Sequence, residues 1–225
     1  MKRQRAKKEG LNIPPIGHID AYAMIVDLNQ FTSMVAKAEE VGDLIAQFTR
    51  DALSGPIMEI EAERGEVIAF MGDAILAVIP DHDDSVVTAC FGIAKNIGRQ
   101  CEYISNIQSS SKDSWPFAPG GPSVKISIEF GRLDVSTIHS RFLGEHRLLI
   151  GSPINHAPRI TAAGKGNRCV VGPRAAQLAF SAYGLDGPQW IKGKRGEPSY
   201  EYYVFSMGDT WIEWPHRKGQ RTSWE

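Results

Sequence analysis

Two aspartates are placed where they could act together on a metal ion. Asp27 lies near the end of the apolar run 21–28, and Asp73 lies at the Gly-Asp tip of a short apolar hairpin, 65–78. If the two runs are neighbouring strands of one sheet, both carboxylates point into the same small volume. Close carboxylates repel each other unless a cation lies between them, and hard divalent cations prefer oxygen ligands. The alternative is that Asp73 is an ordinary residue of a tight turn.

The segment that follows Asp27 could bind phosphate. Residues 28–35 have the pattern of a helix that begins directly after the first strand. A helix N-terminus presents free backbone N–H groups and the positive end of the helix dipole, which favour an anion. Asn29 or Thr32 could equally serve as an ordinary N-cap, so the residues alone leave both interpretations open.

A third group of polar side chains lies in the segment 151–160, where Gly-Ser-Pro favours the start of a helix. On such a helix Asn155 and Arg159 are four residues apart, so both side chains lie on one face. They could form a surface pair, or they could bind a phosphate group together. Pro158 weakens this helix, which indicates that something besides helix propensity fixes the segment.

The rest of the chain supplies helices and strands for a single domain. Apolar residues with helical spacing cover 41–63, where Gly55-Pro56 predicts a kink or two short helices, and another helix is expected at roughly 84–107. The alternating strand 123–130 is followed by a protruding β-arm at 132–145. The remaining expected elements are a strand at 169–172, a short helix at 173–180 and a closing hairpin formed by 190–194 and 200–205.

Composition narrows the functional classes. A chain of 225 residues with 42% hydrophobic and 23% charged residues fits one globular core. The formal net charge of −1 argues against a partner DNA or RNA. Three cysteines without close spacing indicate neither a disulfide framework nor a zinc site. With no signal peptide and no apolar run of bilayer length, we expect a cytoplasmic protein without a membrane span.

The chain is expected to have one domain and two tails. Residues 1–19 are expected to be a basic flexible tail, 20–206 the domain, and 207–225 a C-terminal tail.

Taken in order, these motifs resemble the class III nucleotidyl cyclase catalytic domain over nearly all of 20–206. Residues 26–32 are similar to the family's first metal-binding strand, and Phe-Met-Gly-Asp at 70–73 is similar to its second. Residues 151–159 are similar to the family's Gly-x-x-x-Asn-x-Ala-x-Arg helix. Several separated motifs in the right order are more specific than any one of them. The resemblance implies an α+β, ferredoxin-like fold with a central, mostly antiparallel sheet flanked by helices.

The resemblance also implies how substrate and metal are held. Asp27 and Asp73, together with Leu28, would hold two divalent cations, Mg²⁺ or Mn²⁺, on a nucleoside triphosphate. Backbone groups of Phe31 and Thr32 would help to hold the phosphates.

Three further residues receive roles from the same resemblance. Asn155 would position the ribose, Arg159 would neutralise charge that develops in the transition state, and Lys194 would hold the outer phosphates. In this family one subunit supplies the aspartates and the other supplies the asparagine and arginine. A single chain therefore implies a head-to-tail homodimer with two equivalent sites.

The base-reading positions depart from the family. Adenylate cyclases typically carry Lys at the position matched to Val67 and Asp or Thr at the one matched to Leu148, whereas guanylate cyclases carry Glu and Cys. Because neither residue is polar here, the chain looks like the stand-alone pyrimidine cyclases of bacterial Pycsar anti-phage systems. That resemblance implies UTP as substrate, cyclic UMP as product and a separate effector protein that binds it. The alternatives are a cytidylate cyclase, an adenylate cyclase with an altered base pocket, and an inactive nucleotide-binding dimerisation module.

Overall fold

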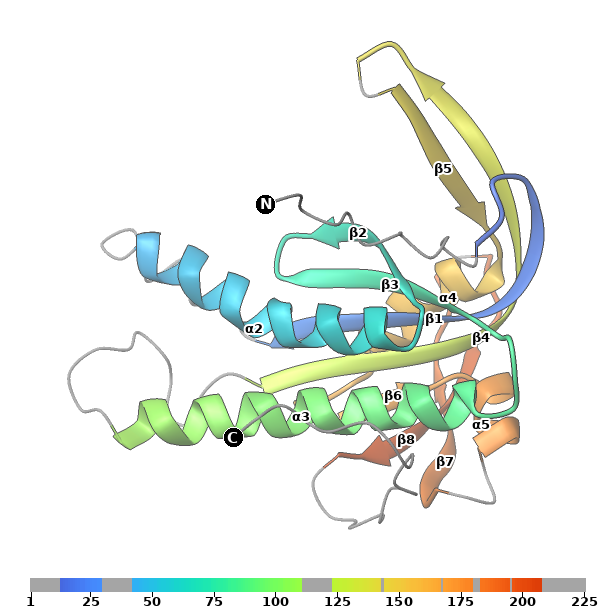
Figure 1. Ribbon diagram of the computed structural model, residues 1–225. Coiled ribbons are helices and arrows are strands. Elements are labelled where there is room, and N and C mark those ends of the chain that lie inside the picture. The colour runs from blue at the N-terminus through green and yellow to red at the C-terminus, as the bar shows by residue number, and fades with distance from the viewer. Residues whose placement is uncertain are drawn as a thin grey trace.

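The computed structural model of the chain describes residues 13–29, 42–110, 123–142, 144–166, 168–179, 183–194 and 196–207. A single sheet runs through these residues in the strand order β2-β3-β1-β4-β6-β8-β7, and β5 pairs with β4 outside this path (Figure 1). Every pair is antiparallel except β4 with β6. The strands are β1 (Gly17–Asn29), β2 (Glu66–Met71), β3 (Ala74–Pro80), β4 (Ser123–Ser140), β5 (Gly144–Ile150), β6 (Arg168–Val171), β7 (Leu185–Ile191) and β8 (Tyr200–Ser206). The predicted fold class is confirmed.

Helices cover both faces of this sheet. On one face, α2 (Gly42–Ala62), α3 (Val86–Ser110) and α5 (Pro173–Ala179) enclose the main core, into which β1 directs Tyr22, Met24, Val26 and Leu28. The short helix α4 (Ser152–Thr161) lies on the other face, where its Ala157 packs against Ala23 and Ile25. Because successive side chains of a strand point to opposite faces, Asp27 lies on the α4 face. We call this side of the sheet the α4 face below.

Of the two forms expected for the second helix, the division into two short helices is wrong. Pro56 lies inside α2, yet the helix runs without interruption from Gly42 to Ala62 (Figure 1). Buried side chains on both sides of the proline, Leu53 and Ile60, anchor the helix to the main core. That packing offsets the hydrogen bond that a proline cannot donate.

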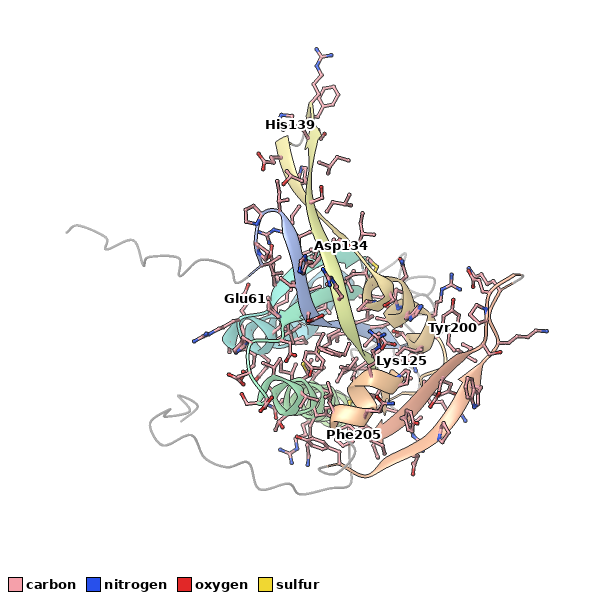
Figure 2. All side chains as sticks on the ribbon, turned by 90° about the vertical axis from the view of Figure 1, so that its right-hand side faces the viewer. Glu61, Lys125, Asp134, His139, Tyr200 and Phe205 are labelled. Carbon is pink, nitrogen blue, oxygen red and sulfur yellow. The ribbon has the colours of Figure 1, made fainter. Side chains whose placement is uncertain are left out.

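The predicted arm is present and is an extension of β4. This strand continues beyond 130 to Ser140 and pairs with β5 in antiparallel register, from Asp134 opposite Ile150 to Ser140 opposite Gly144. Figure 2 shows the arm rising from the body of the protein, with Asp134 partway along it and His139 near its end. Ile138 and Phe142 are exposed on the arm. Two apolar side chains on a projecting hairpin are typical of a contact surface.

Some expectations lie outside the described residues. These are the helix after Asp27, most of the N-terminal tail, and the C-terminal tail beyond 207. Within the described residues, no helix is both long enough and apolar enough to cross a membrane.

Candidate active site

The sheet register brings Asp27 and Asp73 together. Asp27 of β1 pairs with Ala74 of β3, which is the residue directly after Asp73. The turn between β2 and β3 is closed by Gly72, whose φ of 70° favours glycine. The backbone N–H of Leu28 donates a hydrogen bond to the carbonyl oxygen of Asp73 over 3.3 Å. The predicted meeting of the two aspartates is therefore a consequence of strand pairing.

The two carboxyl groups are held at an electrostatic cost. Burial raises the pKa of Asp27, and the neighbouring Asp73 carboxylate raises it further. Burial also raises the pKa of Asp73, while its own backbone N–H and Lys125 lower it. Lys125 lies opposite Asp27 on β4 and lowers the pKa of Asp27 as well. One lysine therefore offsets part of the repulsion between two carboxylates.

This donor set suits hard divalent cations. Two carboxylates that repel each other, at a strand end and a hairpin tip, gain from a Mg²⁺ or Mn²⁺ ion between them. Such ions bind through one or two carboxylates and complete their coordination with water and substrate phosphates. Among the described residues, no group of three or more His, Cys, Asp or Glu side chains could hold a metal ion. Asp27 and Asp73 alone fit cations that arrive with a polyphosphate.

The helix α4 presents Asn155 and Arg159 away from the sheet. Its inward face buries Pro153, Ala157, Ile160 and Thr161, whereas Asn155 is exposed and Arg159 is half-buried. The Thr161 hydroxyl donates to the Ala157 carbonyl oxygen over 2.6 Å, and Ser127 of β4 donates to the same oxygen over 3.1 Å. These bonds fix the helix on the sheet despite the proline at 158.

Arg159 is engaged by the loop between β7 and β8. Its guanidinium donates two hydrogen bonds to the two carboxylate oxygens of Glu197 and lies 5.2 Å from the centre of the Tyr200 ring. The same carboxylate accepts the backbone N–H of Lys194 over 3.2 Å. The structure therefore brings Arg159 and Lys194 into one cluster, although they are far apart in the sequence.

Within a single chain, the two groups of site residues stay apart. Among the described residues, no ion pair joins Arg159 to Asp27 or Asp73, and the Arg159 carboxylate partner is Glu197. Phe31 and Thr32, the residues expected to hold phosphate through their backbone, lie outside the described residues.

The two candidate base-reading residues lie in different environments. Leu148 of β5 is exposed on the arm, opposite Ser136 of β4. Val67 of β2 packs against the main core on the α2 and α3 side, whereas Ala69 packs against Ala157 and its neighbours on the α4 face. An irregularity in the pairing of β2 with β3 lies between Val67 and Ala69. Val67 therefore faces the main core, while Ile68 and Ala69 lie beside the clusters on the α4 face.

Sequence reasoning missed Lys125, Glu197 and Tyr200. Lys125 could have been found from the alternation of β4, since Val124 and Ile126 are buried in the main core and Lys125 must point to the opposite face. Glu197 and Tyr200 gave no comparable signal, because only the folded β7–β8 hairpin places them beside α4.

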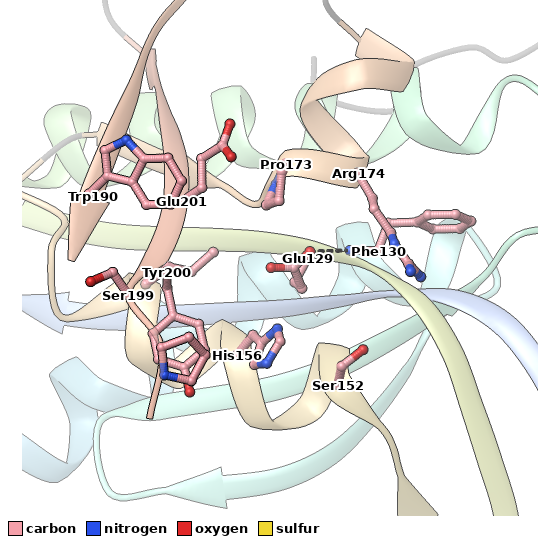
Figure 3. Close-up of a pocket in the computed structure, with 12 residues that line it drawn as sticks. Glu129, Phe130, Ser152, His156, Pro173, Arg174, Trp190, Ser199, Tyr200 and Glu201 are labelled. Atoms are coloured by element: carbon pink, nitrogen blue, oxygen red, sulfur yellow. Dashed lines mark hydrogen bonds between the residues drawn. The ribbon is translucent and has the colours of Figure 1, made fainter. Parts of the chain in front are cut away.

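A cavity lies beside Tyr200. It has a volume of about 530 Å³ and is lined by Glu129, His156, Arg174, Trp190 and Tyr200, among others. Figure 3 shows Glu129 at its floor, accepting a hydrogen bond from the backbone N–H of Phe130.

Two residues that line this cavity have shifted pKa values. Burial lowers the pKa of His156, and the nearby Arg159 lowers it further. Burial raises the pKa of Glu129 to about 7, although the Phe130 N–H and Arg174 act in the opposite direction.

This raised pKa predicts a pH-dependent stability. Folded Glu129 keeps its proton up to about pH 7, whereas the unfolded chain releases it near the ordinary value of 4.5. Its contribution to stability is therefore complete at low pH and is lost as the pH rises through 7. The E129Q variant cannot ionise, so its unfolding free energy relative to the wild type should increase by up to about 3 kcal/mol between pH 5 and pH 8.

Urea denaturation of both proteins at the two pH values tests this expectation. The matched control is E61Q, because Glu61 is an exposed carboxylate on α2 (Figure 2). A difference between E129Q and wild type that is the same at pH 5 and pH 8 would contradict the assignment of a protonated buried Glu129.

Solved structures of nucleotide cyclases share this arrangement of elements. The guanylyl cyclase Cya2 aligns with a TM-score of 0.73 at 14% identity, covering 91% of this chain and 98% of that one. The adenylyl cyclase CyaB from P. aeruginosa aligns with a TM-score of 0.72 at 13% identity, covering 84% and 94%. The chain has the fold of the adenylyl and guanylyl cyclases. A guanylate cyclase domain of RhGC from Catenaria anguillulae, solved in complex with GTP, aligns with a TM-score of 0.62 at 15% identity, covering 84% and 98%.

The likeness is one of structure. No protein-family model matches the sequence, and no curated protein matches it either. The three motifs lie on the kinds of element that the sequence predicted for them. The first lies at the end of the strand β1, the second at the tip of the β2–β3 hairpin and the third on the helix α4.

Proposed function

We propose that the protein is a nucleotidyl cyclase that converts a nucleoside triphosphate, UTP by preference, into its 3′,5′-cyclic nucleotide and pyrophosphate. The observation that carries this proposal is the convergence of Asp27 and Asp73 on the α4 face of a cyclase fold. Both carboxylates are desolvated and mutually repelled, which is an arrangement that a cation-bound polyphosphate relieves. An unused pair of turn aspartates would more simply face water.

Each residue of the site has a distinct task in this reaction. Asp27 and Asp73, with Leu28 beside them, hold the divalent cations, which would neutralise the phosphates and activate the ribose 3′-hydroxyl for in-line attack on the α-phosphorus. Asn155 orients the ribose by hydrogen bonding, Arg159 stabilises the charge that develops on the phosphoryl oxygens, and Lys194 binds the outer phosphates. The backbone of Phe31 and Thr32 completes the phosphate contacts.

We propose further that the active site forms between two copies of the chain arranged head to tail. Asn155 and Arg159 point away from the sheet that carries the aspartates, and Arg159 is held by Glu197 of its own chain. In a dimer, Asn155 and Arg159 of one copy can reach the aspartates of the other copy, although they point away from the aspartates of their own chain. A two-fold axis makes the two resulting sites equivalent.

The base preference rests on apolar residues. Leu148 and Val67 offer a base no hydrogen bond from their side chains, so the residue pairs with which adenylate and guanylate cyclases read a purine are both missing. Pyrimidine specificity, with cyclic UMP acting on a separate effector protein in anti-phage defence, follows from the resemblance to the Pycsar cyclases. A cytidylate cyclase and an adenylate cyclase with an altered pocket use the same catalytic residues.

The experiment that tests the proposal is incubation of the purified protein with ATP, GTP, CTP and UTP in the presence of Mn²⁺, followed by mass spectrometry of the products. Cyclic UMP as the main product is the expected result. Cyclic CMP or cyclic AMP would retain the cyclase and overturn the UTP preference. No cyclic product from any of the four substrates would overturn the catalytic proposal in favour of a nucleotide-binding dimerisation module.

A further inference from the structure

The ion pair between Arg159 and Glu197 lies at the centre of the proposed phosphate-binding cluster. Nη2 of Arg159 donates to Oε1 of Glu197 over 2.7 Å, and Nη1 donates to Oε2. The pKa of Glu197 is lowered chiefly by this bond. A guanidinium has five N–H donors and one positive charge. In this arrangement Glu197 accepts hydrogen bonds from two of the five Arg159 donors. Its negative charge also neutralises the positive charge with which Arg159 would stabilise the transition state.

The loop between β7 and β8 fixes the carboxylate where Arg159 meets it. The N–H of Glu197 donates to the carbonyl oxygen of Lys194 over 2.8 Å, which closes a turn, and Oε2 accepts the N–H of Lys194 in return. A side chain at Gly193 would place its Cβ 2.1 Å from the carbonyl oxygen of Pro198, so the close approach of the loop strands requires glycine there. Gly196 adopts a φ of 86°, which also favours glycine. The position of Glu197 is thus built into the loop.

The hydrogen bonds to the Glu197 carboxylate are of the kind that a phosphate group would accept. Two oxygens accept a fork of guanidinium N–H groups and one of them accepts a backbone N–H, which is how proteins bind phosphoryl oxygens. The side chains of Arg159 and Glu197 are 30% and 32% exposed, so the pair is open to competition from solvent anions. Partly exposed ion pairs are weak, and a triphosphate carries several charges against the single charge of a carboxylate.

We propose that Glu197 is a competing anion that occupies the Arg159 and Lys194 phosphate site until the triphosphate of the substrate displaces it. Glu197 thereby sets the affinity for substrate without touching the reacting atoms. The inference rests on the proposed function for the identity of the displacing ligand. It requires only that the ligand be a polyphosphate.

The test measures binding of inorganic triphosphate by isothermal titration calorimetry in EDTA, so that neither metal nor turnover contributes. The E197Q variant keeps the size and shape of the side chain but lacks its charge and one of its two acceptor oxygens. Removing one like charge within contact distance of the bound anion should tighten binding about 5- to 10-fold. The matched control is D186N, which removes one negative charge from an exposed position on β7 of the same hairpin and should leave the affinity unchanged.

A double-mutant comparison distinguishes competition for Arg159 from a general electrostatic effect of removing a negative charge. The gain of E197Q should vanish when Arg159 is replaced by alanine, because the competition is for the guanidinium. An unchanged affinity in E197Q, or a gain of equal size in the R159A background, would overturn the proposal. Thermal unfolding of each variant verifies that the loop change has not unfolded the chain.

Steady-state kinetics of the active enzyme provide a second, independent test. Displacement predicts that E197Q lowers KM for the nucleotide and leaves kcat equal or higher. A positioning role, in which Glu197 holds Arg159 for catalysis, predicts instead a lower kcat at unchanged KM and would overturn the proposal. Failure of the wild type to form any cyclic product would overturn the proposed function, while the triphosphate titration would still decide the role of Glu197.

Discussion

The D73N variant should lose nearly all cyclase turnover, by about 1000-fold or more, while the fold persists. Asparagine retains the shape and the turn-forming character of aspartate, so the β2–β3 hairpin should close around Gly72 as before. What disappears is one of the two charged oxygen ligands that we propose for the cations. The measurement is the rate of cyclic nucleotide formation at saturating Mn²⁺, with Mn²⁺ binding followed separately by calorimetry.

The stability of metal-free D73N distinguishes a metal ligand from a turn residue. Because burial raises the pKa of Asp73, and because its carboxylate raises the pKa of Asp27, loss of this charge relieves desolvation and repulsion. The melting temperature of D73N should therefore equal or exceed that of the wild type. The matched control is D20N, which removes an exposed carboxylate at the other end of β1 and should keep full activity. Full turnover in D73N, or a marked loss of its stability, would refute the metal-site assignment.

Much of the fold follows from local patterns in the sequence. The alternation of β1 places Tyr22 and Met24 in the main core and leaves Asp27 on the opposite face, so a reader of the sequence can assign both faces. The hairpin with Gly72 at its tip and the helix that turns Asn155 and Arg159 away from the sheet follow from turn chemistry and helical spacing in the same way.

Other features depend on contacts between distant segments. The continuity of α2 through Pro56 depends on packing against the main core, which outweighs the local preference of proline. The irregular pairing after Val67 changes which β2 residue faces α4, and no local pattern signals it. Glu197 meets Arg159 only because β7 and β8 pair and return the chain to α4. The sequence therefore predicts the strand faces and turns on which the candidate residues lie better than it predicts the contacts that those residues make.

Mixing two inactive variants should restore activity. In a head-to-tail homodimer each site combines aspartates from one chain with Asn155 and Arg159 from the other. D73N and R159A are each expected to be inactive alone, because each damages both sites of its own dimer. In a 1:1 mixture that exchanges subunits freely, half of the dimers are mixed, and each mixed dimer has one intact site. About a quarter of the wild-type activity should return.

The control pair uses lesions on the same half of the site. A mixture of D73N with D27N places a damaged aspartate in every site of every dimer, so no activity should return. Recovery in the first mixture but not in the second requires the aspartates and Arg159 to come from different chains. If the site were complete within one chain, neither mixture would recover, and the separation of Arg159 from the aspartates in the structure would have to be closed by movement of α4. The strong anchoring of that helix through Ser127 and Thr161 argues against such movement and in favour of the second chain.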